Sequence, residues 1–96
     1  MQEFSIGRCS NNPQRWYVSF PNVLEPFHMP TIKQMLEKQQ YQVLSTTPNV
    51  NVFRNKEVRL TWHSHGLIQI DLYNHKLQSA KNIEQLIKEI FVSNTK

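Results

Sequence analysis

Cysteine and glycine are scarce in this chain of 96 residues, which contains one cysteine and two glycines. The lone Cys9 cannot form an intramolecular disulfide or complete a cysteine-based metal site, and it fits a reducing intracellular compartment. With only Gly7 and Gly66, no glycine-rich loop can wrap a phosphate group. These absences exclude disulfide-stabilised secreted domains and nucleotide-binding enzymes built on such a loop.

Long apolar segments are missing as well. The first residues of the chain contain Glu3 and Arg8 and no hydrophobic run, so we expect no signal peptide. No part of the chain approaches the roughly 18 consecutive apolar residues that a membrane-spanning helix requires. We therefore expect a cytoplasmic protein that does not enter the membrane.

Aspartate occurs once, as Asp71, and this limits the catalytic arrangements that the chain can form. A Ser-His-Asp triad would need this residue from the middle of a predicted strand. Cys9 would need a helix N-terminus or a nearby cation to stabilise its thiolate, and the sequence indicates neither. The sequence therefore predicts a protein that is not an enzyme and that holds no cofactor.

Positive charge is in moderate excess, because eleven Lys and Arg against seven Asp and Glu give a formal charge of +4. This balance favours acidic partners, such as nucleic acid, over cationic ones. The basic residues form no run, however, and a mildly basic composition is also compatible with a protein that has no such partner. The length suits one domain, residues 1–96, with a modest core.

Two helices are predicted from apolar residues spaced three and four positions apart. The second of them, near the C-terminus, has the clearer pattern, and Ser79 suits its N-cap because the hydroxyl can accept a bond from the first turn. A shorter helix is predicted over about 30–40, where Pro30 suits the first helical position. The apolar stripe of the C-terminal helix consists of Ile83, Leu86, Ile87, Ile90 and Phe91.

Short segments of alternating apolar residues predict a β-sheet. The predicted strands are 15–20, 41–46, 50–52, 57–62 and 68–72. The last four are joined by short turns into an antiparallel meander. Phe4 and Ile6 extend the first strand into a possible hairpin, and 21–28 is predicted to be a connecting loop. The fold class is therefore α+β, a two-layer sandwich of about five antiparallel strands with two helices on one face.

The other face of this sheet has nothing in the chain to cover it. The side chains predicted to lie there are Asn51, Phe53, Arg59, Thr61, Leu67, Gln69 and Asp71. Basic, amide and aromatic groups on an exposed sheet can contact phosphates and stack or wedge against bases, and Arg54 and Lys56 would add charge to such a surface. One alternative is an ordinary solvated face on which Arg59 and Asp71 neutralise each other across two strands. The other is a surface for a protein partner or a second copy of the chain.

Two histidines, His63 and His65, flank Ser64 in the turn between the last two predicted strands. Imidazoles at this spacing can chelate a metal ion, which would imply a metal-dependent activity. A specific zinc site needs three or four ligands, and histidines in a turn beside Gly66 are more often exposed polar residues. We therefore expect no metal here and keep His63 and His65 only as candidate ligands.

The order of the predicted elements resembles one half of the TATA-box binding protein. Between about residues 16 and 91, the segments PTIKQMLEKQQYQVLS, VRLTWHSHGLIQIDLY and AKNIEQLIKEIF are similar to small prokaryotic proteins with that fold. In the family the uncovered sheet face lies on the DNA minor groove, with paired phenylalanines wedged between base steps. The resemblance implies that Arg59, Thr61 and Phe53 lie on the equivalent face of this chain.

The chain holds a single half without an internal repeat, so a complete DNA-binding saddle of that kind would need two chains. The leading hypothesis is a non-catalytic, nucleic-acid-associated module that uses the open sheet face, through Arg54, Lys56, Arg59, Thr61 and Gln69 together with Phe53. The second is a protein-interaction or self-association module that uses the same face. A metal-dependent activity at His63 and His65 is the third.

Overall fold

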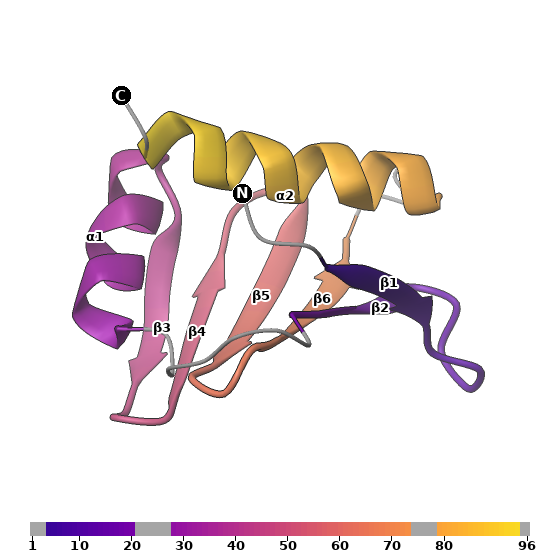
Figure 1. The fold of residues 1–96 in the computed structure, drawn as a ribbon, viewed down its shortest axis with the longest axis horizontal. Helices are drawn as coiled ribbons and strands as arrows, with labels where there is room; N and C mark the ends of the chain where they lie inside the picture. Colours follow the sequence, from indigo (N-terminus) through magenta and orange to yellow (C-terminus); the bar gives the residue numbers. More distant parts are fainter. Residues whose placement is uncertain (1–3, 21–27, 74–78, 95–96) are drawn as a thin grey trace.

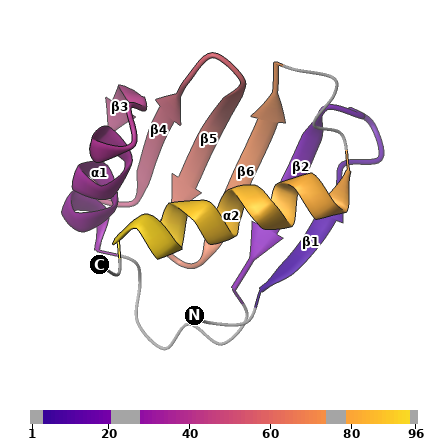
Figure 2. The same cartoon turned by 90° about the horizontal axis from the view of Figure 1, so that it is seen from above.

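A computed structural model describes residues 4–20, 28–73 and 79–94. Six strands form one antiparallel sheet, and Figures 1 and 2 show both helices on the same side of it. In Figure 2, α2 (Ala80–Asn94) crosses over the strands, while α1 (Met29–Lys38) lies beside one edge. The strands are β1 (Ser5–Arg8), β2 (Arg15–Ser19), β3 (Gln42–Thr46), β4 (Val50–Arg54), β5 (Val58–His63) and β6 (Leu67–Leu72).

The strand order across the sheet is β1-β2-β6-β5-β4-β3. The predicted α+β class and the predicted meander of β3 to β6 are confirmed. The strand count of about five was too low by one, because Ile6 of β1 pairs with Val18 of β2 and extends the sheet beyond the meander. The predicted loop over 21–28 lies outside the described residues, apart from His28.

Helix α1 begins one residue before Pro30 and ends in a hydrogen-bonded reversal. The backbone N–H of Tyr41 donates to the carbonyl of Leu36 at 3.0 Å, and that of Gln40 donates to the carbonyl of Glu37 at 3.0 Å. This pair of bonds is the Schellman arrangement, which places Gln40 in the left-handed region at φ 68°. Glycine is the residue that normally occupies this position without strain.

Helix α2 begins as its sequence predicts. The Ser79 hydroxyl accepts a hydrogen bond from the backbone N–H of Asn82 at 3.1 Å, which confirms it as the N-cap. Neither helix of the described chain is long and apolar enough to span a membrane. The helix buries Ile83, Ile87 and Ile90 against the sheet.

The core lies between the helices and the sheet. The buried cluster there includes seven side chains that join β5 and β6 to α2. They are Leu60, Trp62, Ile68, Ile70, Ile83, Ile87 and Ile90. Each is at most 1% exposed, so these contacts hold α2 to the sheet. Helix α1 adds Met29, Ile32, Met35 and Leu36 to the same cluster.

The prediction that Asn51 and Phe53 lie on the open face is wrong. Phe53 is 0% exposed and Asn51 2% exposed, and both point to the helix side of β4. The large Phe53 ring fills the core, while the side-chain oxygen Oδ1 of Asn51 accepts a hydrogen bond from the backbone N–H of Thr47 at 3.1 Å. Their neighbours Val50 and Val52 occupy the open face instead, because side chains alternate along a strand.

Candidate functional site

On the open face, residues that pair across neighbouring strands stand side by side in rows. One row contains three of the four arginines in the chain, and we call it the arginine row. Its members, from β2 to β3, are Arg15, Asp71, Arg59, Arg54 and Gln42. At the usual spacing between strands, such a row is about 19 Å long.

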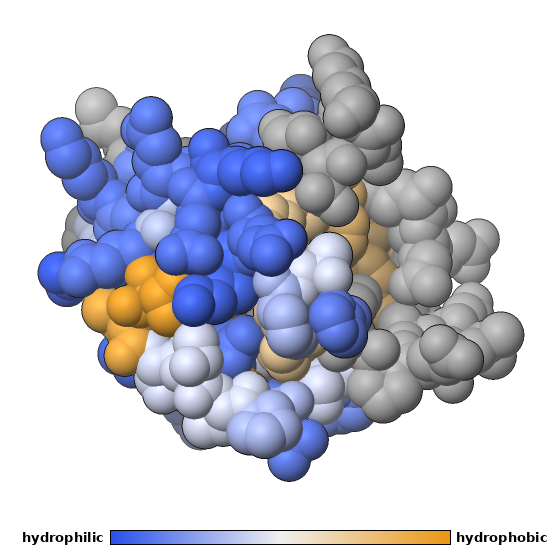
Figure 3. All heavy atoms as spheres, turned by 90° about the vertical axis from the view of Figure 1, so that its left-hand side faces the viewer, coloured by the Kyte–Doolittle hydropathy of each residue, from blue (hydrophilic) through white to orange (hydrophobic). Residues whose placement is uncertain are grey.

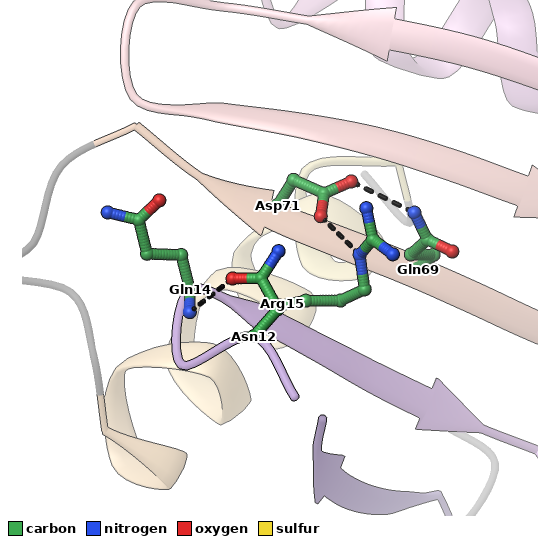
Figure 4. Close-up of polar contacts among 5 residues, drawn as sticks. All are labelled: Asn12, Gln14, Arg15, Gln69 and Asp71. Atoms are coloured by element: carbon green, nitrogen blue, oxygen red, sulfur yellow. Dashed lines mark hydrogen bonds and ion pairs between the residues drawn. The ribbon is translucent and has the colours of Figure 1, made fainter. Parts of the chain in front are cut away.

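The Asp71 side chain forms its ion pair with Arg15 of the neighbouring strand β2 (Figure 4). One carboxylate oxygen accepts a bond from Arg15 Nε at 2.7 Å, and the other accepts from Gln69 Nε2 at 3.0 Å. The hydrogen bond and charge of Asp71 raise the pKa of Arg15 above its ordinary value. Each oxygen thus accepts a hydrogen bond from a residue other than Arg59, and the ion pairs of the described residues do not include Arg59 with Asp71.

The backbone of Arg15 is also positioned by a hydrogen bond. Its N–H donates to the carbonyl of Asn12 at 3.0 Å, and the side chain of Asn12 accepts a bond from the N–H of Gln14 at 3.0 Å (Figure 4). This Asn12 turn fixes the start of β2, and with it the register that aligns Arg15 with Asp71.

Arg54 and Arg59 stand directly opposite each other on β4 and β5, and both are exposed. Arg54 Nε donates to the side-chain oxygen of Gln42 at 3.1 Å, whereas Arg59 forms no ion pair with any described carboxylate. Like charges in directly opposite positions of a sheet destabilise it. Three arginines and one aspartate leave two uncompensated positive charges in the row, so the free protein has repulsion here that a bound anion would relieve.

The adjacent row carries the neutral groups of the open face. Thr61 and Gln69, which were predicted to lie on the open face, pair with each other in this row, and the side chain of Val52 lies beyond them on β4. Tyr17 of β2 pairs with Gln69 and is the aromatic residue of this row. Tyr17 was not among the predicted site residues, although its position between the buried Trp16 and Val18 indicated the open face.

Lys56 lies in the turn between β4 and β5, between the two strands that carry Arg54 and Arg59. The turn is held by Asn55, whose side-chain oxygen accepts bonds from the N–H groups of Glu57 at 2.8 Å and Val58 at 2.9 Å. Of the six predicted nucleic-acid contacts, four share the open face and Lys56 borders it. The sixth, Phe53, is on the opposite side.

His63 and His65 approach each other in the turn between β5 and β6, with their ring centroids 5.6 Å apart. Within 4–20, 28–73 and 79–94, no three His, Cys, Asp or Glu side chains gather closely enough to hold a metal ion. His63 lies on the open face, opposite Val50 and Leu67.

No protein-family model, curated protein sequence or solved structure matches this chain.

Proposed function

We propose that the open sheet face is a non-catalytic nucleic-acid-binding surface on which the arginine row contacts phosphate groups. The observation that carries this proposal is the alignment of Arg15, Arg59 and Arg54 in one row beside a single carboxylate. Guanidinium groups suit phosphate oxygens, because each can donate two parallel hydrogen bonds.

The electrostatics of the row support the same function. Arg59 has no carboxylate partner among the described residues, and its charge faces that of Arg54. A phosphate group beside this pair would replace repulsion with attraction and would release counterions from the nucleic acid. The affinity of the protein for nucleic acid should therefore fall steeply as the salt concentration is raised from low to physiological.

Tyr17 and its row supply contacts to bases. The half-buried Tyr17 side chain lies next to the arginine row, where its ring is available to stack on an unpaired base. Thr61 and Gln69 in the same row offer hydrogen-bonding groups to base edges. Together the two rows combine backbone contacts with base contacts on one surface.

The strand order supports the resemblance to one half of the TATA-box binding protein. Without β1, the chain runs as strand, helix, four-strand meander and helix, with β2 placed beside β6. The resemblance is limited to the order and arrangement of the helices and strands. With Phe53 buried in the core, it does not extend to a wedge of paired phenylalanines.

The proposal is tested by fluorescence anisotropy with labelled single- and double-stranded oligonucleotides of mixed sequence at low salt. We expect Arg59→Ala to weaken binding by about fivefold, as the loss of one phosphate contact would. Lys81→Ala, which removes an exposed charge from α2, is the matched control and should change affinity by less than about twofold. Undetectable binding of both oligonucleotides by the unmodified protein would contradict the proposal.

Self-association is the second candidate, and the apolar part of the open face favours it. Val50, Val52 and Leu67 are half-buried on this face, and a two-fold dimer would cover them. The β3 edge is less suited to pairing, because its register shifts between Val43 and Ser45. Figure 3, which views the side formed by α1 and β3, shows mostly hydrophilic side chains there, with a compact, strongly hydrophobic patch and some weakly hydrophobic areas.

Sedimentation equilibrium from micromolar to hundreds of micromolar protein tests self-association. A constant mass near 11.4 kDa would exclude the dimer in this range. A mass that rises with concentration, and that Leu67→Lys returns to the monomer value, would support it.

A further inference from the structure

A cavity of about 380 Å³ lies on the helix side of the molecule, away from the open face. It is bounded by α2, by the connection from α1 to β3, and by the turn between β4 and β5. Its volume falls within the range of small-molecule sites. The polar side chains around it include Gln39, Tyr41, Asn55, Glu57, Gln85 and Glu89.

The charge of this cavity is opposite to that of the chain as a whole. Glu57 and Glu89 line it from the β4–β5 turn and from α2, and no described Lys or Arg does. The ion pairs among the described residues are Arg15–Asp71 and Glu84–Lys88, so neither lining carboxylate is neutralised by one. Both residues are exposed, and the Glu89 carboxylate also accepts a hydrogen bond from Gln85 Nε2 at 3.2 Å. Two carboxylates without a cationic partner among the described residues favour a cationic ligand at this place.

Tyr41 brings a buried polar group to the same place. The residue is 7% exposed, and burial, followed by the charges of Glu57 and Glu89, raises the pKa of its phenol to about 12. A hydrogen bond with the Asn55 side chain offsets part of this effect. The phenol therefore stays neutral at ordinary pH, and its oxygen can accept a hydrogen bond from a bound cation.

Apolar side chains complete the lining. They come from β5, β6 and α2, and they are Val58, Leu72, Ile83, Leu86 and Ile90. An apolar floor below a polar, acidic rim suits a ligand that combines a hydrocarbon stem with a charged end, because the stem is removed from water while the charge meets carboxylates.

We infer that this cavity binds an ammonium or guanidinium group carried on a short methylene chain. The methylenes lie on the apolar floor, and the cation contacts Glu57, Glu89 and the Tyr41 hydroxyl. Such a group occurs both in free amines and in lysine or arginine side chains of peptides. The inference does not depend on nucleic-acid binding, since the arginine row contributes nothing to the contacts of the cation.

The inference is tested by recording amide chemical shifts of the full chain during titration with agmatine, with n-butylammonium and with neutral n-butanol. We expect saturable shifts around Tyr41, Asn55 and Glu89 with the two cations. n-Butanol should shift the same amides at least about fivefold less at equal concentration, because it lacks the charge. A pentapeptide with a central arginine forms a further arm, and tighter binding of the peptide than of agmatine would identify a protein side chain as the source.

Matched variants separate this site from general attraction to an acidic surface. Glu57→Gln and Glu89→Gln should each weaken agmatine binding by about five- to tenfold, whereas Glu84→Gln, on the same helix but paired with Lys88, should change it less than about twofold. Retained dispersion of the amide spectrum shows that each variant is folded. The inference is overturned if no saturable shifts occur up to about 50 mM agmatine. It is also overturned if Glu84→Gln weakens agmatine binding as much as Glu89→Gln does.

Discussion

The two faces of the sheet differ along the same strands. On the helix side, β5 and β6 present only apolar side chains, and each is at most 2% exposed. On the open side the same two strands present Arg59, Thr61, His63, Leu67, Gln69 and Asp71. Because side chains alternate along each strand, the residues that stabilise the fold and those available for binding lie on opposite faces. Substitutions on the helix side should therefore change the free energy of unfolding, and those on the open side should change binding.

The largest effect is expected on the helix side. Ile87→Ala removes a fully buried side chain from the contact between α2 and the sheet, and it should lower the free energy of unfolding by about 2–5 kcal/mol. Thr61→Ala, on the open side of β5, should cost less than about 1 kcal/mol. Chemical denaturation measures both. A loss below about 0.5 kcal/mol for Ile87→Ala would show that α2 packs through another face.

A pH titration sharpens the comparison, because the helix side also contains the buried Tyr41. Its pKa rises from 10 in the unfolded chain to about 12 in the fold, so the fold favours the neutral phenol. The contribution of the neutral Tyr41 side chain to the free energy of unfolding is fully present below pH 10, and it is lost as the pH rises towards 12. Tyr41→Phe should remove this part of the alkaline destabilisation. Parallel curves of unfolding free energy against pH for both proteins would contradict it.

A small gain in stability is expected at the end of α1. Gln40→Gly relieves the left-handed backbone at φ 68° and should raise the free energy of unfolding by about 0.5–1 kcal/mol. Gln39→Gly is the control, because Gln39 has φ −93° and gains no such relief. It should instead lower stability, and an equal response of the two variants in thermal denaturation would contradict the assignment.

Much of the fold could be predicted because its signals are local. The stripe of α2, its Ser79 cap and the alternation of β5 and β6 each depend on residues within one element. The pattern failed at β4, where Val50 and Val52 compete with Phe53 for the core. Alternation cannot choose between two apolar sets, and the choice is made by the register with β5 and by the volume of the ring.

The site was less predictable because it depends on pairing between distant segments. Alternation placed Arg59 on the open face, but the arginine row requires Arg15 to align with Asp71, 56 residues later in the chain. The acidic cavity depends even more on tertiary structure, since Tyr41, Glu57 and Glu89 come from three separate elements. No spacing in the sequence connects them.

The central claim, that the open face binds phosphate groups through the arginine row, is tested most directly by the salt dependence of nucleic-acid binding. The logarithm of the binding constant should fall linearly with the logarithm of salt concentration, and Arg59→Ala should make this slope shallower by about 0.7–0.9, the value of one lost phosphate contact. Lys81→Ala should leave the slope unchanged. Equal slopes for the unmodified protein and Arg59→Ala would contradict the account.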